Sequence, residues 1–527
     1  MRISLLLLFM LFAAPLMAQT SSCSPGVVWE DRNADGRRDP GEPPLPGIRL
    51  SDGASVATTD AQGRYALPLV DGRTVFLVKP ASHALPVRRN GSPDFCFNVQ
   101  RRPGPALKYG GIPAQPARCR DFGLLPRAQP GAEPLEVLLF ADPQVKSVRD
   151  LDYYWRDIVQ PLVGEHGAAL GMSLGDLMDD NLSLLPDVLR TTMSLGVPWM
   201  HLPGNHDMDL DAGSDEDALR TYRAHFGPDT YAREEAQAVF IALDNVIYSP
   251  GAKPAYTGGF RDDQFAFLEA YLPTVPRDRL LVLGMHIPLF EDGADSFRDA
   301  DRQRLFELLR GFPRVLVLSG HSHAQRHWYH DAASGWQGAT PLHEYNVGTA
   351  CGGFWSGVKD AAGIPVATMA DGTPNGYARL SINPGGAYSL SWHPARDADA
   401  SGMGLHAPKV LRQGAYPAWG VYANVHMGDG DSVVEYRIGE GDWKPMRKVL
   451  QPDPALLVEN ALDDLAAELR GYDRSPEAKP SQHLWRGALP TDLPAGEHQV
   501  RVRYRDRWRG LREARTRYRL EAVPEAN

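Results

Sequence analysis

The chain has 527 residues and a formal net charge of −10, with 43% hydrophobic, 23% charged and 9% aromatic residues. This length is more than one hydrophobic core usually supports, so we expect several domains, and the composition excludes a largely disordered chain. The negative charge disfavours a general attraction to polyanions, so no nucleic-acid polymer is expected as a partner and any affinity for phosphate must be local.

The first eighteen residues have the layout of a cleavable secretory signal. Arg2 precedes an apolar run from Leu5 to Phe12, and small residues precede Gln19. The run is too short to cross a bilayer, and no other long apolar stretch follows. We therefore expect residues 1–18 to be a signal peptide, no transmembrane span, and a periplasmic or secreted protein.

An N-terminal β-sandwich domain is expected over residues 19–125. Apolar and polar residues alternate between turn signals there, as in GRYALPLVDGRTVFLVKP. In an oxidising compartment Cys23, Cys96 and Cys119 could supply one disulfide, and the sequence leaves the pair open. A stretch rich in Pro, Gly and Arg, residues 101–134, is expected to join this domain to the next.

An acidic stretch in this domain, DRNADGRRDPGE at residues 31–42, fits the twelve-residue calcium-loop pattern. The helices that flank an EF-hand are not evident. The surrounding segments instead resemble the B-type repeats of bacterial surface adhesins, which implies one structural Ca²⁺; the alternative is a solvated acidic turn. The oxygen ligands would be Asp31, Asn33, Asp35, Asp39 and Glu42.

From Leu135 onward, apolar strands alternate with helical segments. EVLLFAD, GMSLGD and VPWMHLPGNHD each end an apolar run with polar residues, and a helical segment is expected around residues 153–163. Such alternation predicts a layered α/β domain, over residues 134–383, with its chemistry at the strand ends. Alternating patterns return in YANVHMG, SVVEYRIG and HQVRVRYRD, which predicts a second β domain over residues 384–527.

Five apolar runs of the α/β region lead, in order, into carboxylate, amide or imidazole side chains. In VLSGHSH, for example, two histidines one residue apart would share a face of extended backbone and could bind one object. This mixture of ligands suits divalent first-row ions, and Asp176 as a shared carboxylate could hold two of them. The candidate ligands are Asp142, Gln144, Asp176, Asn205, His286, His321 and His323.

A candidate acid lies within the same set. Two cations about 3.5–4 Å apart can bind phosphoryl oxygens and lower the pKa of a bound water to about 7. Attack on phosphorus then expels an alkoxide, which needs a proton. His206 lies between a candidate ligand and Asp207, so we expect His206 and Asp207 to be catalytic. Asp179 and Asp180 are expected to orient ligands or water.

The ordered blocks DPQ, GDLMD, GNHD, a lone histidine and GHSH resemble the five-block signature of the calcineurin-like metallophosphoesterases, over roughly residues 135–383. The resemblance implies a four-layer α/β metallophosphoesterase β-sandwich with flanking helices and, on either side, a β-sandwich-like domain. It implies an enzyme that hydrolyses small phosphate monoesters or diesters, and with the expected signal peptide this enzyme would be exported. One metal would be bound by Asp142, Gln144, Asp176 and His323. The second would be bound by Asp176, Asn205, His286 and His321.

One residue departs from the family pattern. The first block is usually DxH, and Gln144 stands where that histidine would be. A glutamine carbonyl oxygen is a harder, neutral ligand, so Mn²⁺ or Mg²⁺ is favoured there over Zn²⁺ or Fe. The alternative is a decayed site in a non-catalytic surface or periplasmic binding protein. A relic has no physical reason to retain Asp176, Asn205 and His286 together.

Two stretches rich in Gly and Asn, EYNVGTACGGFWSG and DGTPNGY, follow the histidine pair. Backbone N–H groups can approach a ligand closely at such residues, although tight structural turns explain them equally well. The candidate substrate contacts are Asn375, Tyr377 and Trp355, with Phe354 also able to flank a leaving group.

The arginines between residues 503 and 519 are expected to be a solvated strand face; the alternative is a docking surface for an anionic polymer or membrane.

Overall fold

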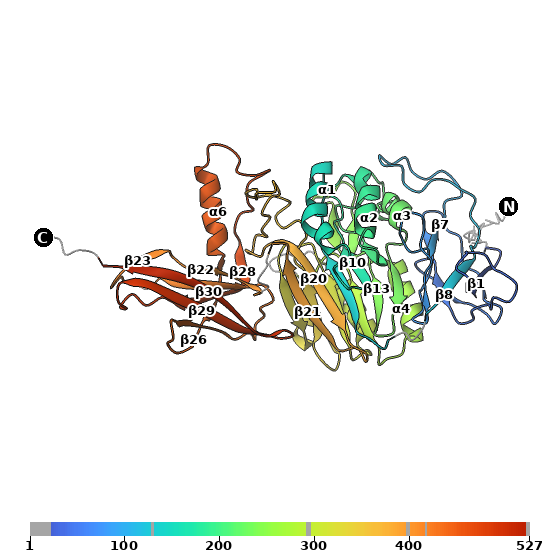
Figure 1. Ribbon diagram of the computed structural model, residues 1–527. Helices are drawn as coiled ribbons and strands as arrows, with labels where there is room; N and C mark the ends of the chain where they lie inside the picture. The colour runs from blue at the N-terminus through green and yellow to red at the C-terminus, as the bar shows by residue number, and fades with distance from the viewer. Residues whose placement is uncertain (1–22, 128–130, 291–296, 397–400, 417–418, 523–527) are drawn as a thin grey trace, which may run out of the picture.

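The computed structural model describes residues 23–127, 131–290, 297–396, 401–416 and 419–522. An N-terminal β domain, a central α/β domain and a C-terminal β domain follow one another from right to left in Figure 1. The expected signal peptide lies outside the described residues. Within them, no helix is both long enough and apolar enough to span a bilayer.

The N-terminal domain consists of two four-stranded sheets. One sheet contains β4 (Arg64–Tyr65), β1 (Gly26–Glu30), β8 (Phe122–Pro126) and β6 (His83–Ala84). The other contains β3 (Val56–Thr58), β2 (Arg49–Ser51), β5 (Thr74–Leu77) and β7 (Cys96–Asn98). The segment expected to be a linker returns to this domain, because β8 pairs in parallel with β1. A disulfide joins Cys23 to Cys119, and Cys96 is a buried free thiol.

Two mixed sheets form the centre of the α/β domain. The first contains β11 (Trp199–Leu202), β10 (Leu170–Leu174), β9 (Leu135–Phe140), β20 (Gly376–Ile382) and β21 (Tyr388–Pro394). The second contains β12 (Tyr231–Glu234), β13 (Ala238–Ala242), β16 (Leu280–Gly284), β17 (Val315–Ser319), β19 (Leu342–Asn346) and β18 (Arg326–His330). The expected boundary at residue 383 falls in the turn between β20 and β21, which pair along their whole length.

Helices accompany the two sheets in the α/β domain (Figure 1). They are α1 (Val148–Tyr154), α2 (Leu185–Met193), α3 (Arg220–Phe226), α4 (Asp262–Tyr271) and α5 (Asp299–Leu309). The domain also contains a hairpin of β14 (Val246–Tyr248) and β15 (Tyr256–Gly258). The helix expected around residues 153–163 begins earlier, and after α1 it continues as a π-helical turn and then a 3₁₀ turn. Side chains of both sheets belong to one hydrophobic core, which fixes the sheets relative to each other.

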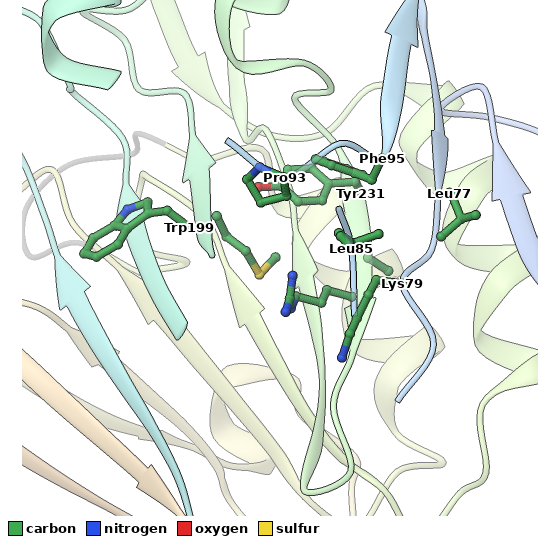
Figure 2. A pocket seen from close by; sticks show the side chains of 10 residues that line it. Leu77, Lys79, Leu85, Pro93, Phe95, Trp199 and Tyr231 are labelled. Atoms are coloured by element: carbon green, nitrogen blue, oxygen red, sulfur yellow. The ribbon is translucent and has the colours of Figure 1, made fainter. Parts of the chain in front are cut away.

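The N-terminal domain contacts the α/β domain through a buried ion pair. Lys79 Nζ lies 2.7 Å from Glu235 Oε1, and both side chains are almost fully buried. Burial lowers the pKa of Lys79 to about 7. Figure 2 shows a small cavity beside this pair, lined by side chains of both domains that include Leu77, Phe95 and Tyr231.

The C-terminal domain also consists of two sheets, with one helix, α6 (Pro454–Leu465). One sheet contains β22 (Met403–His406), β24 (Gly420–Val425), β28 (Pro480–Ala488) and β27 (Arg447–Pro452). The other contains β23 (Val410–Arg412), β30 (Gly510–Glu521), β29 (Gly496–Asp506), β25 (Val434–Ile438) and β26 (Lys444–Pro445). The arginines of β29 and β30 alternate with buried or partly buried residues, and several pair with glutamates, as Arg503 does with Glu435.

The disulfide should stabilise the N-terminal domain by closing a long loop. Cys119→Ser should lower its free energy of unfolding by about 2–5 kcal/mol, because the bond spans 96 residues. Differential scanning calorimetry measures this, with Cys96→Ser as the control that removes a buried cysteine without removing a bond. Thiol titration of the unfolded protein without reductant should find the two free cysteines, Cys96 and Cys351. Four reactive thiols would contradict the bond.

Candidate metal centre

The seven candidate ligands lie where strands of the two central sheets end. Asp142 and Gln144 follow β9, Asp176 follows β10, Asn205 follows β11, His286 follows β16, and His321 and His323 follow β17. The strands run parallel within each sheet, so their carboxyl ends meet at one edge. The structure therefore brings together all seven residues that the sequence nominated.

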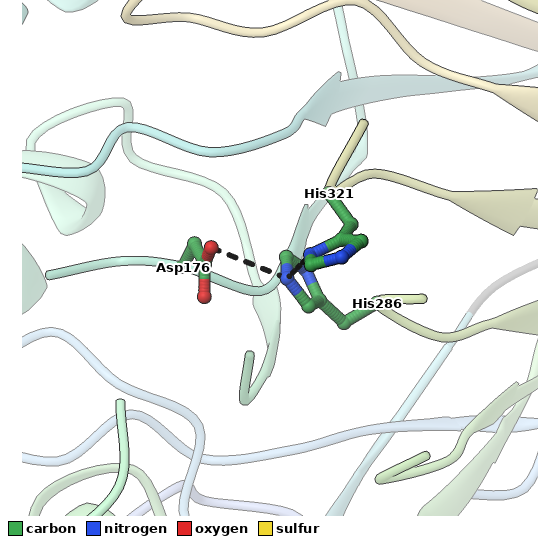
Figure 3. A group of neighbouring side chains, drawn as sticks. All are labelled: Asp176, His286 and His321. Carbon is green, nitrogen blue, oxygen red and sulfur yellow. Dashed lines mark hydrogen bonds and ion pairs between the residues drawn. The ribbon is translucent and has the colours of Figure 1, made fainter. Parts of the chain in front are cut away.

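His286 is the centre of one group of these side chains (Figure 3). Its Nε2 atom lies 3.2 Å from Asp176 Oδ2, 3.0 Å from Asn205 Oδ1 and 3.2 Å from His321 Nδ1. Its Nδ1 atom lies 2.9 Å from the carbonyl oxygen of Leu174, which can accept the Nδ1 proton. A carbonyl partner on the far nitrogen is the usual arrangement of a histidine that ligates a metal.

Asp142 and His323 form a second group beside the first. His323 Nε2 lies 3.8 Å from Asp142 Oδ1, and His323 Nδ1 lies 2.7 Å from the carbonyl oxygen of Gly352. The backbone N–H of His321 donates to both carboxylate oxygens of Asp142, at 3.2 and 3.1 Å. Gln144 is buried in the same loop as Asp142. The contact between His321 and Asp142 makes the two groups neighbours.

Asp176 lies between the two groups. Its Oδ2 faces His286, its Oδ1 accepts the backbone N–H of His206 at 2.9 Å, and its carbonyl oxygen accepts the N–H of Gln144 at 2.9 Å. A Cβ atom at Gly204 would lie 2.2 Å from Asp176 Oδ1. Glycine is therefore required for the loop after β11 to approach this carboxylate.

The backbone is strained at the same residues. Positive φ occurs at five of the seven candidate ligands: Asp142, Gln144, Asp176, His321 and His323. Left-handed backbone costs a non-glycine residue about 1–2 kcal/mol, and such strain gathers at functional sites. The two histidines after β17 are therefore not in the extended backbone that the sequence suggested. Their rings point into different groups instead of sharing one face.

The pKa values suit a cation site. Burial lowers the pKa of His321 to about 3 and that of His323 to about 4, so both rings are neutral and each retains a lone pair. Burial raises the pKa of Asp142 to about 8. Although burial opposes it, the charge of His286 holds the pKa of Asp176 below its ordinary value. Neutral imidazoles and buried carboxylates are the donors that divalent transition metals bind.

Asp180, and not Asp207, is the partner of the candidate acid His206. His206 Nδ1 lies 2.8 Å from Asp180 Oδ1 and 3.5 Å from Asp179 Oδ1. Burial lowers the pKa of His206, but the hydrogen bond to Asp180 and the charge of the nearby Asp176 outweigh burial and raise this pKa to about 9. His206 therefore carries a proton at neutral pH. The expectation of a catalytic Asp207 is corrected by its position.

Asp207 is fully buried and joins two loops. Its carboxylate accepts backbone N–H groups of Gly204 at 2.8 Å, Leu177 at 3.0 Å and Met178 at 2.9 Å. Three donors fit the ionised carboxylate, although burial raises the pKa of Asp207 to about 7. The residue therefore holds the loops after β10 and β11 together and does not face a reactant.

Two of the three candidate substrate contacts are also corrected. Trp355 is 0% exposed, and its indole N–H donates to the carbonyl oxygen of Pro143 at 2.9 Å. Asn375 is buried and donates to Asp157 and to the carbonyl oxygen of Ala350. Both residues hold loops in place. Tight turns, the alternative reading of these stretches, describe them better.

Tyr377, the third candidate, and Phe354, which precedes Trp355, are more accessible. Tyr377 is half-buried and stacks on His393, with ring centroids 5.2 Å apart. Phe354, which the sequence ranked behind Trp355, is 47% exposed and stacks on His323. Sequence pattern could not separate two adjacent aromatic residues by their direction, because both have left-handed backbone.

Asp207→Asn should destabilise the protein far more than Asp180→Asn. An amide offers one acceptor oxygen to three N–H donors, so the loss should be about 2–4 kcal/mol. The Asp180 carboxylate is half exposed, so its replacement should change stability by less than about 0.5 kcal/mol. Thermal midpoints of both variants test this. Equal midpoints would show that Asp207 does not hold the loops together.

Comparison with solved structures finds 19 matching chains. One is a purple acid phosphatase isolated from yellow lupin (Lupinus luteus) seeds, with 14% identity and a TM-score of 0.34, covering 72% of this chain and 68% of that chain. Another is the anchor in the inner membrane complex of Plasmodium, with 13% identity and a TM-score of 0.33, covering 51% of this chain and 87% of that chain. No curated protein sequence matches the chain.

Three family models match successive parts of the chain. Residues 32–106 match the N terminal of calcineurin-like phosphoesterase, residues 135–325 match calcineurin-like phosphoesterase itself, and residues 344–510 match its C terminal. The central match contains all seven candidate ligands. The chain therefore belongs to the calcineurin-like phosphoesterases, in the branch with N-terminal and C-terminal flanking domains, and is a metal-dependent hydrolase of phosphoric esters.

Proposed function

We propose that this protein is an exported phosphoesterase that hydrolyses small phosphate monoesters or diesters at a centre of two divalent metal ions. The observation that carries the proposal is the convergence of seven donor side chains at the ends of five strands, with left-handed backbone at five of them. A structural role would not require such strain. The same observation disfavours a decayed, non-catalytic domain.

The ligands divide into two sets that share Asp176. Asp142, Gln144 and His323 would hold one ion, and Asn205, His286 and His321 would hold the other. Two such ions, when bound, would supply an activated water and charge for the phosphoryl oxygens. The amide oxygen of Gln144 favours Mn²⁺ or Mg²⁺ in the first position over Zn²⁺ or Fe.

The acid of the reaction would be His206. Asp180 accepts a hydrogen bond from its Nδ1 atom and so fixes the ring, which leaves Nε2 to hold a proton for the departing oxygen. Because the pKa of His206 is raised to about 9, the proton is present at neutral pH. Asp207 would act only through the loops that it holds.

Export is supported by two independent features. The first eighteen residues have the pattern of a signal peptide. The Cys23–Cys119 disulfide lies in the domain that would follow it, and such bonds persist in oxidising compartments. Both features favour a periplasmic or secreted protein.

The acidic loop after β1 supports a structural Ca²⁺ in the N-terminal domain. The N–H of Gly36 donates to Asp31 Oδ2 at 2.9 Å, and Glu42 accepts the N–H groups of Arg32 and Asp39 at 2.8 and 3.0 Å. Asp31 Oδ1 is buried and has no hydrogen-bond partner within the described ranges. A cation would satisfy it. The proposed donors are Asp31, Asn33, Asp35, Asp39 and Glu42.

Activity should depend on added metal. After chelation, wild-type protein should not hydrolyse p-nitrophenyl phosphate or bis-p-nitrophenyl phosphate, and Mn²⁺ or Mg²⁺ should restore turnover. Asn205→Ala and His286→Asn should each lower kcat/KM by more than about 100-fold, because each removes a direct ligand. His498→Asn, in the C-terminal domain, is the control and should leave kcat/KM unchanged. Full activity of Asn205→Ala would contradict the ligand assignment.

Calcium should stabilise the N-terminal domain without serving catalysis. Adding Ca²⁺ at 100 times its dissociation constant to chelated protein should stabilise it by about 2.7 kcal/mol, visible as a higher thermal midpoint. Asp31→Asn should abolish the shift. Asp60→Asn, which alters another acidic turn of the same domain, should retain it. An equal shift in wild type and Asp31→Asn would contradict a calcium site in this loop.

A further inference from the structure

An exposed aromatic side chain lies at the mouth of the metal centre. The ring of Phe354 stacks on that of the candidate ligand His323, with centroids 4.4 Å apart and planes 25° from parallel. Phe354 remains 47% exposed, whereas the next residue, Trp355, is 0% exposed. Both residues have left-handed backbone, with φ of 58° and 56°, and one ring is exposed while the other is buried. The outward ring offers a flat apolar face beside the reacting centre.

Two cations lie on the side of the mouth formed by the loop after β9. Lys146 is two residues beyond the candidate ligand Gln144, and Arg149 lies in the first turn of α1. The Nζ atom of Lys146 lies 5.4 Å from the ring centroid of Tyr472, and the guanidinium of Arg149 lies 5.2 Å from it. One aromatic ring thus holds both cations by cation–π contact.

The ring that holds these cations comes from the C-terminal domain. The segment that contains Tyr472 pairs with the loop after Phe354: Gly357 N–H donates to the carbonyl oxygen of Asp473 at 3.1 Å, and Val358 and Gly471 form a β-bridge. The flanking domain therefore contributes directly to the mouth of the metal centre. Phe354 and Tyr472 lie on adjoining segments.

The cations have no carboxylate partner within ion-pairing distance in the described part of the chain. Most arginines elsewhere in that part do, as Arg503 has Glu435. Burial raises the pKa of Asp179, and the charges of His206 and Lys146 oppose that rise; Asp179 lies 3.5 Å from His206. The charge of Lys146 therefore acts on the side of the centre from which the leaving group would depart. Cations without an ion-pair partner at such a position fit an anionic ligand.

We propose that this rim, defined as Phe354, Lys146, Arg149 and Tyr472, selects phosphate esters whose leaving group carries an aromatic ring and a second anionic group. A nucleoside diphosphate, cleaved at its terminal phosphate, is the representative substrate. Phe354 stacks on the base, while Lys146 and Arg149 bind the phosphate that leaves with the nucleoside. The proposal rests on the proposed phosphoesterase function.

The reaction on this substrate balances without another reactant. An oxygen of water forms a bond to the terminal phosphorus, and the bond from that phosphorus to the bridging oxygen breaks. The electron pair stays on the bridging oxygen, which becomes part of the nucleoside monophosphate and takes a proton from His206. The proton that the attacking water gives up restores His206. The products are nucleoside monophosphate and inorganic phosphate. Lys146 and Arg149 contact the leaving phosphate throughout.

The experiment compares adenosine 5′-diphosphate with p-nitrophenyl phosphate, which has a ring but no second anionic group. For Lys146→Met, kcat/KM for adenosine 5′-diphosphate relative to p-nitrophenyl phosphate should fall by about tenfold or more, through KM, because a charged contact is lost. Phe354→Ala should lower kcat/KM for both esters, because both leaving groups carry a ring that can stack on Phe354. Lys448→Met is the matched control: Lys448, on β27, has its Nζ atom 5.3 Å from the centroid of the Trp485 ring, and the variant should leave the ratio unchanged.

The outcomes separate the rim from the phosphoesterase function. If wild type hydrolyses p-nitrophenyl phosphate and either Lys146→Met keeps the ratio within twofold or Phe354→Ala leaves kcat/KM of both esters unchanged, the rim proposal is wrong and the function stands. If wild type hydrolyses neither ester with any metal, the proposed phosphoesterase function is wrong. Calorimetric titration with adenosine 5′-diphosphate then tests whether the rim binds this ligand. Binding weakened by Lys146→Met but not by Lys448→Met supports it, and equal binding overturns it.

Discussion

Two carboxylates buried side by side are the constraint on which the structure of this protein depends. Asp142 is 0% exposed and Asp176 is 2% exposed, and buried negative charge is costly unless positive charge lies close by. The imidazole of His286 supplies part of that charge in the protein alone. Divalent cations, when bound, would supply far more positive charge beside these two carboxylates. The left-handed backbone, the close approach at Gly204 and the loop contacts of Asp207 all keep the carboxylates together.

The flanking domains are fixed by polar contacts of the same buried kind. Lys79 of the N-terminal domain pairs with Glu235, and His483 of the C-terminal domain lies 3.0 Å from Asp371. Such pairs give little net stability but specify one orientation, because misplacing a domain would leave a charge buried alone. A fixed C-terminal domain is what allows Tyr472 to hold cations at the mouth of the metal centre.

Much of the fold and of the site could be predicted from the sequence, and the failures share a cause. The apolar runs predicted the strands of the central sheets, and the polar residues after them predicted the candidate ligands. This works because the carboxyl ends of parallel strands meet at one edge of a sheet. Side-chain direction within the loops could not be predicted. Positive φ at Asp180 turned that carboxylate toward His206, and positive φ at Phe354 and Trp355 decided which ring is buried. Pattern alone assumes ordinary backbone.

The most direct test of two metal ions sharing Asp176 is anomalous diffraction from crystals of the protein loaded with Mn²⁺. The account predicts two anomalous peaks about 3.5–4 Å apart, one beside Asp142 and His323 and one beside Asn205 and His286. Asp176 should lie between them. No peak, or a single peak away from Asp176, would contradict the account.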